Sequence, residues 1–288
     1  MSDPARQPPR PQPREIAELK RLGLEHPELA DAANLHVALL ELERRVQARV
    51  PTPWIELTPE WAKARFEAGK PLLRFAEIPL DWTDFRLVFR QTSDLLLRFG
   101  AIEAADHQAL VAVARSGHAL EPLVVGWFEA AADPGAPRGA ASPPVPHAEV
   151  IDQVIGLAMR PFLERCAEVV QQRADFREWS RSTCPLCGGE PDFGVLTSSG
   201  ERRLICGRCT ARWPFDFSTC PYCGNADSAR LQSFGSSDGL YRLDACDACR
   251  RYLKAYNAPA GGRPVMLALD SVATLPLDAA AIQRGYGG

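Results

Sequence analysis

The sequence lacks any long apolar run and any strong excess of charge of one sign. No stretch approaches the ~18 apolar residues that a membrane-spanning helix needs. The 33 basic and 36 acidic residues leave a formal net charge of −3. We therefore expect no membrane anchor, and charge gives no general reason to expect binding to nucleic acid or to a membrane surface. With 46% apolar residues in a chain of 288, there is enough material for a real core.

The start of the chain lacks the apolar core of a secretory signal. Residues 1–14 carry five prolines and no apolar run, so we expect a disordered lead-in. The pair Arg44 and Arg45 lies inside a helical pattern and is therefore not a twin-arginine export signal. These observations predict a cytoplasmic protein.

Cysteine is absent before residue 165, and histidine is absent after residue 150. The five histidines are His26, His36, His107, His118 and His147. Nine cysteines in an exported chain would suggest disulfides, but regularly spaced cysteines in a reducing compartment indicate a metal site. The uneven distribution of the two residue types predicts a multidomain protein whose parts have different roles.

Residues 15–180 are predicted to form an all-α N-terminal domain of six or seven helices. Apolar residues recur there at i, i+3, i+4 and i+7, which is typical of helices with one buried face. One predicted helix begins near Pro27. The others cover Glu60–Ala68, Phe85–Phe99, Glu103–Ser116, Leu120–Ala131 and His147–Arg173. The segment Asp133–Pro146 is rich in proline, glycine and alanine and is predicted to be a loop.

Four C-x-x-C knuckles follow the helical part. They are Cys184 with Cys187, Cys206 with Cys209, Cys220 with Cys223, and Cys246 with Cys249. A knuckle on a tight turn directs two thiolates at one point, and two knuckles close a tetrahedron around one ion. The eight cysteines are therefore predicted to bind two metal ions, each held by four thiolates.

The spacing of the knuckles favours pairing in chain order. Gaps of 18 and 22 residues can each hold a β-hairpin that folds one knuckle back onto the next, whereas the middle gap of 10 links two units. The predicted hairpins pair Phe193–Thr197 with Arg202–Cys206 and Arg230–Phe234 with Leu240–Ala245. We therefore expect two small β modules, residues 181–215 and 216–260, followed by a C-terminal tail, residues 261–288.

The chemistry of these sites argues against an enzyme. When cysteine fills all four positions there is no open coordination site, so Lewis-acid hydrolysis is not expected. No βαβ pattern surrounds any knuckle, which argues against a thioredoxin-type redox pair. One interpretation is that the ions have a purely structural role. They would then stabilise small β units that have little core of their own. Four thiolates suit both zinc and a single rubredoxin-type iron, so the metal stays open at this point.

The remaining chemistry-bearing residues have plainer interpretations. Cys166 lies on the apolar face of a helix and is expected to be a buried, inert thiol. The histidines are expected at the surface or at helix ends, and no close carboxylate pair or Ser-His-Asp set is evident. Trp213, Phe215, Tyr252 and Leu253 follow the knuckles and either pack the two units together or anchor a protein interface.

From about residue 180 to the end, the pattern resembles the FdhE family of formate dehydrogenase accessory proteins. The residues that carry the resemblance are Cys184–Gly188, Arg203–Cys209 leading to Trp213, Cys220–Cys223, Cys246–Cys249 with Tyr252–Lys254, and Asp270–Asp278 ending near Gly285 and Tyr286. The helical part resembles the family in domain order and length.

The resemblance implies a non-catalytic maturation factor of the cytoplasm. Such a protein would act as a chaperone that binds the catalytic subunit of respiratory formate dehydrogenase before its export. The family's metal modules are rubredoxin-like, which favours iron over zinc. A homodimer is left open.

Two other functions compete with this interpretation. A rubredoxin-like electron-transfer protein would use the two sites to carry single electrons. A zinc-ribbon protein would bind nucleic acid, but residues 184–256 hold nine basic against eight acidic side chains, and each loaded site adds about −2. Nucleic-acid readers are usually basic, so no nucleic-acid partner is predicted.

Overall fold

The computed structural model describes residues 12–116, 118–132 and 148–287. Within these ranges, the part before residue 180 is helical. Its α-helices are α1 (Gln12–Glu25), α2 (Ala30–Gln47), α3 (Pro59–Glu67), α4 (Trp82–Arg98), α5 (Ala104–Arg115), α6 (Leu120–Ala132) and α7 (Ala148–Gln171). Most of the lead-in predicted for residues 1–14 and the loop predicted for residues 133–146 lie outside the described residues.

Helices α3 and α4 begin close to where the sequence predicts, whereas α1 is not among the predicted helices and includes residues 12–14 of the predicted lead-in. Asp81 caps α4 because its carboxylate accepts hydrogen bonds from two backbone N–H groups, those of Thr83 and Asp84, at 2.8 and 2.9 Å. Thr58 caps α3 in the same way, from the N–H of Trp61. The apolar stripe of α4 is buried, with Phe85 and Phe89 fully inaccessible to solvent.

The six strands of the described residues join in one sheet. They are β1 (Pro191–Leu196), β2 (Arg202–Cys206), β3 (Arg212–Pro214), β4 (Leu231–Gly235), β5 (Tyr241–Cys246) and β6 (Tyr252–Asn257). Their order is β3-β2-β1-β6-β5-β4, and each pair is antiparallel except β1 and β6, which run parallel. The two predicted hairpins are β1–β2 and β4–β5.

The parallel pair connects the strands of the two predicted β modules. Gly194 of β1 lies opposite Ala255 of β6, and a Cβ at Gly194 would come within 3.2 Å of the Ala255 Cβ. The absence of a side chain at residue 194 therefore allows this close approach of the two strands. The strands of the two predicted modules therefore form one continuous sheet, joined through the β1–β6 pair.

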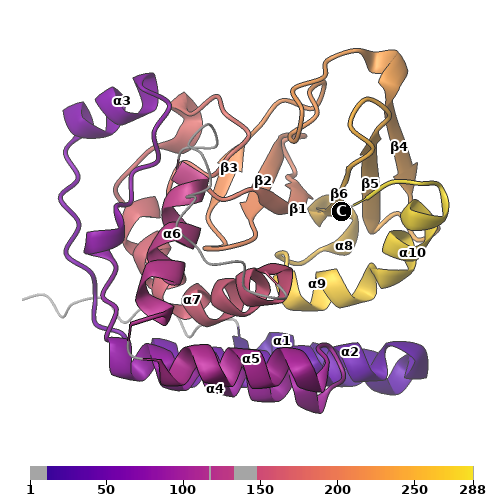
Figure 1. Cartoon of the computed structure of the whole chain (residues 1–288). Coiled ribbons are helices and arrows are strands. Elements are labelled where there is room, and N and C mark those ends of the chain that lie inside the picture. The colour runs from indigo at the N-terminus through magenta and orange to yellow at the C-terminus, as the bar shows by residue number, and fades with distance from the viewer. Residues whose placement is uncertain (1–11, 117, 133–147, 288) are drawn as a thin grey trace, which may run out of the picture.

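The sheet and the helices share a core. Helix α7 lies between the layer of α1, α2, α4 and α5 and the sheet (Figure 1). Leu163 and Val170 of α7 belong to the same buried cluster as Cys187 and Leu204 of the first β module. Main-chain hydrogen bonds also connect the two parts, since the N–H groups of residues 72 and 73 donate to the carbonyls of residues 185 and 186 at 2.9 and 2.8 Å. The predicted order of a helical part followed by β modules is confirmed.

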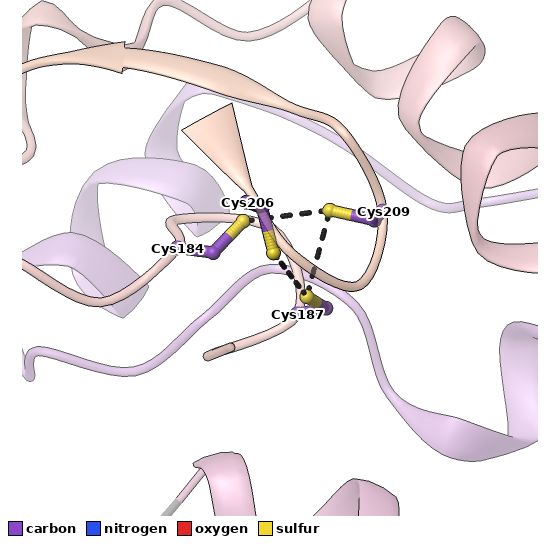
Figure 2. Close-up of side chains that lie close together, drawn as sticks. All are labelled: Cys184, Cys187, Cys206 and Cys209. Atoms are coloured by element: carbon purple, nitrogen blue, oxygen red, sulfur yellow. Dashed lines mark hydrogen bonds between the residues drawn. The ribbon is translucent and has the colours of Figure 1, made fainter. Parts of the chain in front are cut away.

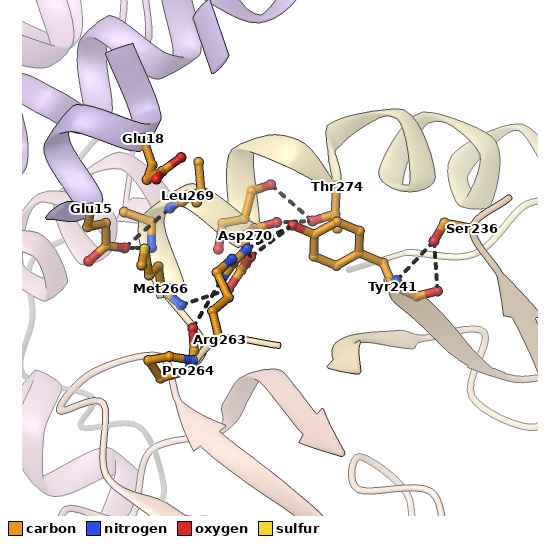
Figure 3. Close-up of polar contacts among 12 residues, drawn as sticks. Glu15, Glu18, Ser236, Tyr241, Arg263, Pro264, Met266, Leu269, Asp270 and Thr274 are labelled. Carbon is orange, nitrogen blue, oxygen red and sulfur yellow. Dashed lines mark hydrogen bonds and ion pairs between the residues drawn. The ribbon is translucent and has the colours of Figure 1, made fainter. Parts of the chain in front are cut away.

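The residues predicted as a tail form α9 (Leu267–Ala273) and α10 (Leu275–Gln283), and the short α8 (Ala258–Gly261) precedes them at the end of the predicted second module. Helix α9 packs on α1 and α2, in a buried cluster that includes Leu19, Val37 and Leu269. The Glu15 carboxylate of α1 accepts hydrogen bonds from two N–H groups at the start of α9, at 2.7 and 3.3 Å (Figure 3). The far end of the chain thus returns to its first helix.

Asp270 of α9 is a fully buried acid. It pairs with the Arg263 guanidinium, and its carboxylate accepts hydrogen bonds from the Tyr241 hydroxyl and the Met266 N–H, both at 2.8 Å (Figure 3). These partners satisfy a charge that burial alone would make costly.

In the described part of the chain, no helix is long and apolar enough to cross a membrane.

Candidate metal centres

The first two knuckles meet at one point. Cys184 and Cys187 precede β1, and Cys206 and Cys209 lie at the end of β2 and in the turn after it. Their Sγ atoms converge (Figure 2), with 3.5 Å from Cys184 to Cys209, from Cys187 to Cys206 and from Cys187 to Cys209. All four side chains are completely buried. We call this group the first cluster.

The last two knuckles form a second cluster of the same design. Its Sγ atoms lie 3.8 Å apart between Cys220 and Cys249, and 3.7 Å apart between Cys223 and Cys246. In each cluster the four sulfur atoms all lie within 4.8 Å of one another. The structure therefore pairs the knuckles in chain order, as their spacing predicts.

The sulfur spacing fits a tetrahedral ion. Metal–sulfur bonds of ~2.3 Å give a tetrahedron with edges of about 3.8 Å, close to the 3.5–3.8 Å seen in both clusters. Both groups could therefore hold one metal ion each, either zinc or a single iron. That these eight cysteines are metal ligands stays a prediction.

Tight turns create this geometry. After each Cys-Pro-x-Cys unit the chain turns through a glycine with positive φ, 77° at Gly188 and 72° at Gly224. The N–H of that glycine donates to the carbonyl of the first cysteine at 2.9 or 3.0 Å. In the first cluster the N–H groups of Leu186 and Arg208 also point at sulfur, both at 3.4 Å. Backbone N–H groups directed at sulfur favour its thiolate form.

The pKa values of the thiols differ within each cluster. Burial raises the pKa of Cys184 and Cys209 well above the usual value. Burial also disfavours the Cys206 thiolate, but hydrogen bonds from the neighbouring sulfurs lower the pKa of Cys206 well below its usual value. In the second cluster the pKa of Cys246 is lowered, because hydrogen bonds from Cys249 and its neighbours outweigh the burial. Cys206 and Cys246 occupy the same place in their clusters.

The helical part holds the first cluster from outside. The Arg160 side chain of α7 donates to the carbonyl of Gly207 at 2.8 Å, between the two cysteines of the second knuckle. The neighbouring Arg208 lies over the Trp127 ring at 3.7 Å and donates to the Trp127 carbonyl at 3.1 Å. The first cluster is therefore built into the interface between helices and sheet.

The other predicted residues divide into confirmed and corrected cases. Cys166 is fully buried, and burial raises its pKa to about 12, as expected of an inert thiol. Trp213, Tyr252 and Leu253 are buried and the partly buried Phe215 packs against the same core, so these residues pack the structure together. The prediction of surface or helix-terminal positions is wrong for His36, which lies within α2. Burial and the nearby Arg160 lower the pKa of His36 to about 4.

The structure also contains a carboxylate pair that the sequence did not reveal. Glu43 of α2 and Glu164 of α7 are hydrogen-bonded, and burial followed by the Glu43 charge raises the pKa of Glu164 well above its usual value. The two residues are far apart in the chain, so no local pattern could have connected them. Glu164 also bonds to Thr210, next to Cys209, and so belongs to the contacts around the first cluster.

The sequence is similar to known proteins over part of its length. No family model matches the chain. The FdhE homologue of Aquifex aeolicus is 28% identical over 133 residues, which cover 44% of this chain and 46% of that protein. Protein FdhE of an Escherichia coli strain is 30% identical over 117 residues, 40% of this chain and 37% of that one. These matches therefore span less than half the length of either relative.

A solved structure extends the likeness to the whole chain. The crystal structure of the FdhE protein from Pseudomonas aeruginosa matches with a TM-score of 0.62 and covers 98% of this chain and 95% of that one, at 23% identity. The two proteins share a fold. The resemblance to the FdhE family predicted from the knuckles is confirmed.

Proposed function

We propose that this chain, a relative of the FdhE proteins, is an accessory protein of formate dehydrogenase. It would act as a maturation chaperone that binds the immature catalytic subunit of the respiratory enzyme in the cytoplasm before export. The observation that carries the proposal is a fold shared with an FdhE protein over 98% of the chain, combined with two four-cysteine clusters.

The clusters support a binding role over a catalytic one. With four thiolates around each ion, a substrate has no coordination position to enter, and hydrolysis by a metal-bound water is disfavoured. The ions would instead supply folding energy to the sheet. The family resemblance favours iron in these sites, with zinc as the alternative.

An electron-transfer protein is the second candidate, and one observation favours it. Cys223 of the second cluster is exposed, so a redox ion there would lie close to solvent and to a redox partner. A reversible visible thiolate-to-iron absorption would support this function. A colourless, zinc-loaded protein would exclude it.

The proposed function is tested by recovering the formate dehydrogenase catalytic subunit on the tagged full-length protein. The variant Cys223→Ser changes the second cluster at its most exposed ligand. The matched control is Cys166→Ala, which removes a cysteine outside both clusters. We expect the control to recover the subunit as well as the native protein and Cys223→Ser to recover less.

Two results would count against the proposal. If the native protein recovers none of the subunit, the partner is wrong. If Cys223→Ser and the control recover equal amounts, the second cluster is not needed for binding. Salt-sensitive capture of DNA or RNA would instead favour the zinc-ribbon alternative.

A further inference from the structure

The two clusters differ sharply in how they are covered. Every cysteine of the first cluster is fully inaccessible, beneath helices and the main chain of residues 72 and 73. In the second cluster Cys220 and Cys246 are buried, but Cys249 is half-buried and Cys223 is exposed. An incoming metal ligand can therefore reach the second cluster without any separation of helices from the sheet.

Residues 284–287, which we call the clasp, lie on the knuckle of Cys246 and Cys249. The Tyr286 hydroxyl donates to the Asp247 carboxylate at 2.8 Å, and the Gly287 N–H donates to the Arg250 carbonyl at 2.7 Å. Asp247 follows one cysteine of this knuckle, and Arg250 follows the other. The clasp thus contacts the backbone that positions two of the four ligands.

Arg250 connects the clasp to the knuckle most extensively. Its guanidinium donates to the carbonyls of Arg284 and Gly285 at 2.6 and 3.2 Å, and to Asp247 at 2.8 Å. It also lies 4.2 Å from the centre of the Tyr286 ring. The backbone of Arg250 has a φ of 60°, which is unfavourable for a residue with a side chain. The clasp contacts therefore help to hold a strained turn next to a metal ligand.

The first cluster has a matching turn with a different support. Thr210 follows Cys209, as Arg250 follows Cys249, and has a φ of 56°. Residues of α7 hold the backbone on both sides of it, because Arg160 donates to the Gly207 carbonyl at 2.8 Å and the Arg212 N–H donates to the Gln171 side chain at 3.1 Å. A helix of the bundle therefore supports this turn in the first cluster, whereas a short segment supports it in the second.

We propose that the second cluster is the exchangeable metal site and that the clasp controls its release and uptake of metal. Opening the clasp breaks a few hydrogen bonds and frees the knuckle of Cys246 and Cys249, so that a competing ligand can replace these thiolates one at a time. Release from the first cluster requires the helices to separate from the sheet. This inference concerns metal exchange alone and does not depend on the proposed partner.

The test uses the full-length protein loaded with Zn²⁺ at both sites and challenged with excess EDTA. Metal release is followed over time, and the freed thiols are alkylated with iodoacetamide and located by mass spectrometry. We expect one equivalent to leave first, with alkylation at Cys223 and Cys249, and the second equivalent to leave more slowly with alkylation at the first cluster.

Tyr286→Phe tests the clasp because it keeps the ring but removes the hydrogen bond to Asp247. Loss of a hydrogen bond to a charged group should speed the first release by roughly tenfold and leave the slow release unchanged. The matched control is Tyr241→Phe, which removes a hydroxyl-to-aspartate bond of the same 2.8 Å length at the other end of β5. It should leave the fast release unchanged.

A variant that ends at Gln283 removes the whole clasp and gives a second, independent measurement. Faster release from this variant supports the proposal even if Tyr286→Phe alone has little effect, because the main-chain contacts are then lost as well. Equal release rates and equal alkylation at the two native clusters would overturn it. So would unchanged release in both clasp variants.

Discussion

At the scale of single residues, backbone geometry favours glycine directly after the two Cys-Pro-x-Cys knuckles. Gly224 has a φ of 72°, yet a Cβ there would meet no atom within 4 Å. A side chain at this position is therefore opposed by backbone strain alone. Gly126, in the middle of α6, also has open space around its missing Cβ but has ordinary helical geometry.

This pair gives a prediction with opposite signs. Gly224→Ala should lower the free energy of unfolding by about 1–2 kcal/mol, because alanine is strained in the left-handed region. Gly126→Ala should raise it by roughly 0.5–1 kcal/mol, because alanine is the better helix former. Denaturant unfolding of the metal-loaded proteins measures both. A loss of stability in Gly126→Ala equal to that in Gly224→Ala would contradict the argument.

His36 provides a pH-dependent prediction at the same scale. Burial and Arg160 lower its pKa from 6.5 to about 4, so the unfolded chain binds a proton at His36 more readily than the folded one. Stability from neutral His36 is complete above pH 6.5 and is lost as pH falls from 6.5 towards 4, by up to about 3 kcal/mol. The variant His36→Gln should lose less stability over this window than the native protein.

The control for His36 is His26→Gln, because His26 is exposed beyond the end of α1. Unfolding free energies are compared at pH 7 and at pH 4.5. If His36→Gln and His26→Gln show the same pH dependence as the native protein, His36 does not become protonated on unfolding in this range.

At the scale of elements, buried polar contacts position α9 against the sheet. Asp270 of α9 connects Tyr241 of β5 with Arg263, and its side chain is fully buried. From the sequence, Asp270 was expected to lie in a C-terminal tail. Only the tertiary contacts show that this acid joins a helix to a strand 29 residues earlier.

Removing the Asp270 carboxylate should strongly destabilise the protein. Asp270→Ala removes a fully buried carboxylate and leaves the partly buried Arg263 guanidinium without its partner, which should cost about 3–5 kcal/mol. Asp175 is a suitable control because it pairs with Arg177 at the surface, where an ion pair contributes little. Thermal unfolding should show a large fall in melting temperature for Asp270→Ala and almost none for Asp175→Ala. Similar melting temperatures for the two variants would mean that α9 is not held through Asp270.

At the scale of the whole molecule, the two clusters have unequal structural weight. The first belongs to the largest buried cluster of side chains, which includes residues of α4, α6 and α7. The second lies next to β4 and β5, at the opposite end of the strand order from β2 and β3, and is partly open to solvent. Losing the first ion should therefore disturb both the helices and the sheet, whereas losing the second should disturb mainly β4, β5 and their turns.

Two single-ligand variants test this difference. Cys187→Ser should broaden or abolish the cooperative thermal transition seen by far-ultraviolet circular dichroism. The reason is that this change removes a metal ligand inside the core that the helices and the sheet share. Cys249→Ser should keep a cooperative transition of the helices at a slightly lower temperature. If Cys249→Ser unfolds the helical part as fully as Cys187→Ser does, the two clusters carry the same structural weight.

Much of this protein was evident from local sequence patterns. Helical stripes and the pairing of knuckles through the hairpins depend on residues close together in the chain, so spacing alone predicted them. The same holds for Cys166, whose place on an apolar helix face is enough to predict burial.

Tertiary structure decided what depends on distant segments. The parallel pairing of β1 with β6, the Glu43–Glu164 pair, the position of His36 near Arg160 and the clasp on the second cluster each join residues that no periodic pattern connects. The sequence by itself determined that two groups of four thiolates form, because ligand spacing is a local constraint. Which cluster is enclosed and which is open was set by how the helices and residues 284–287 pack around them, since burial is a property of the whole fold.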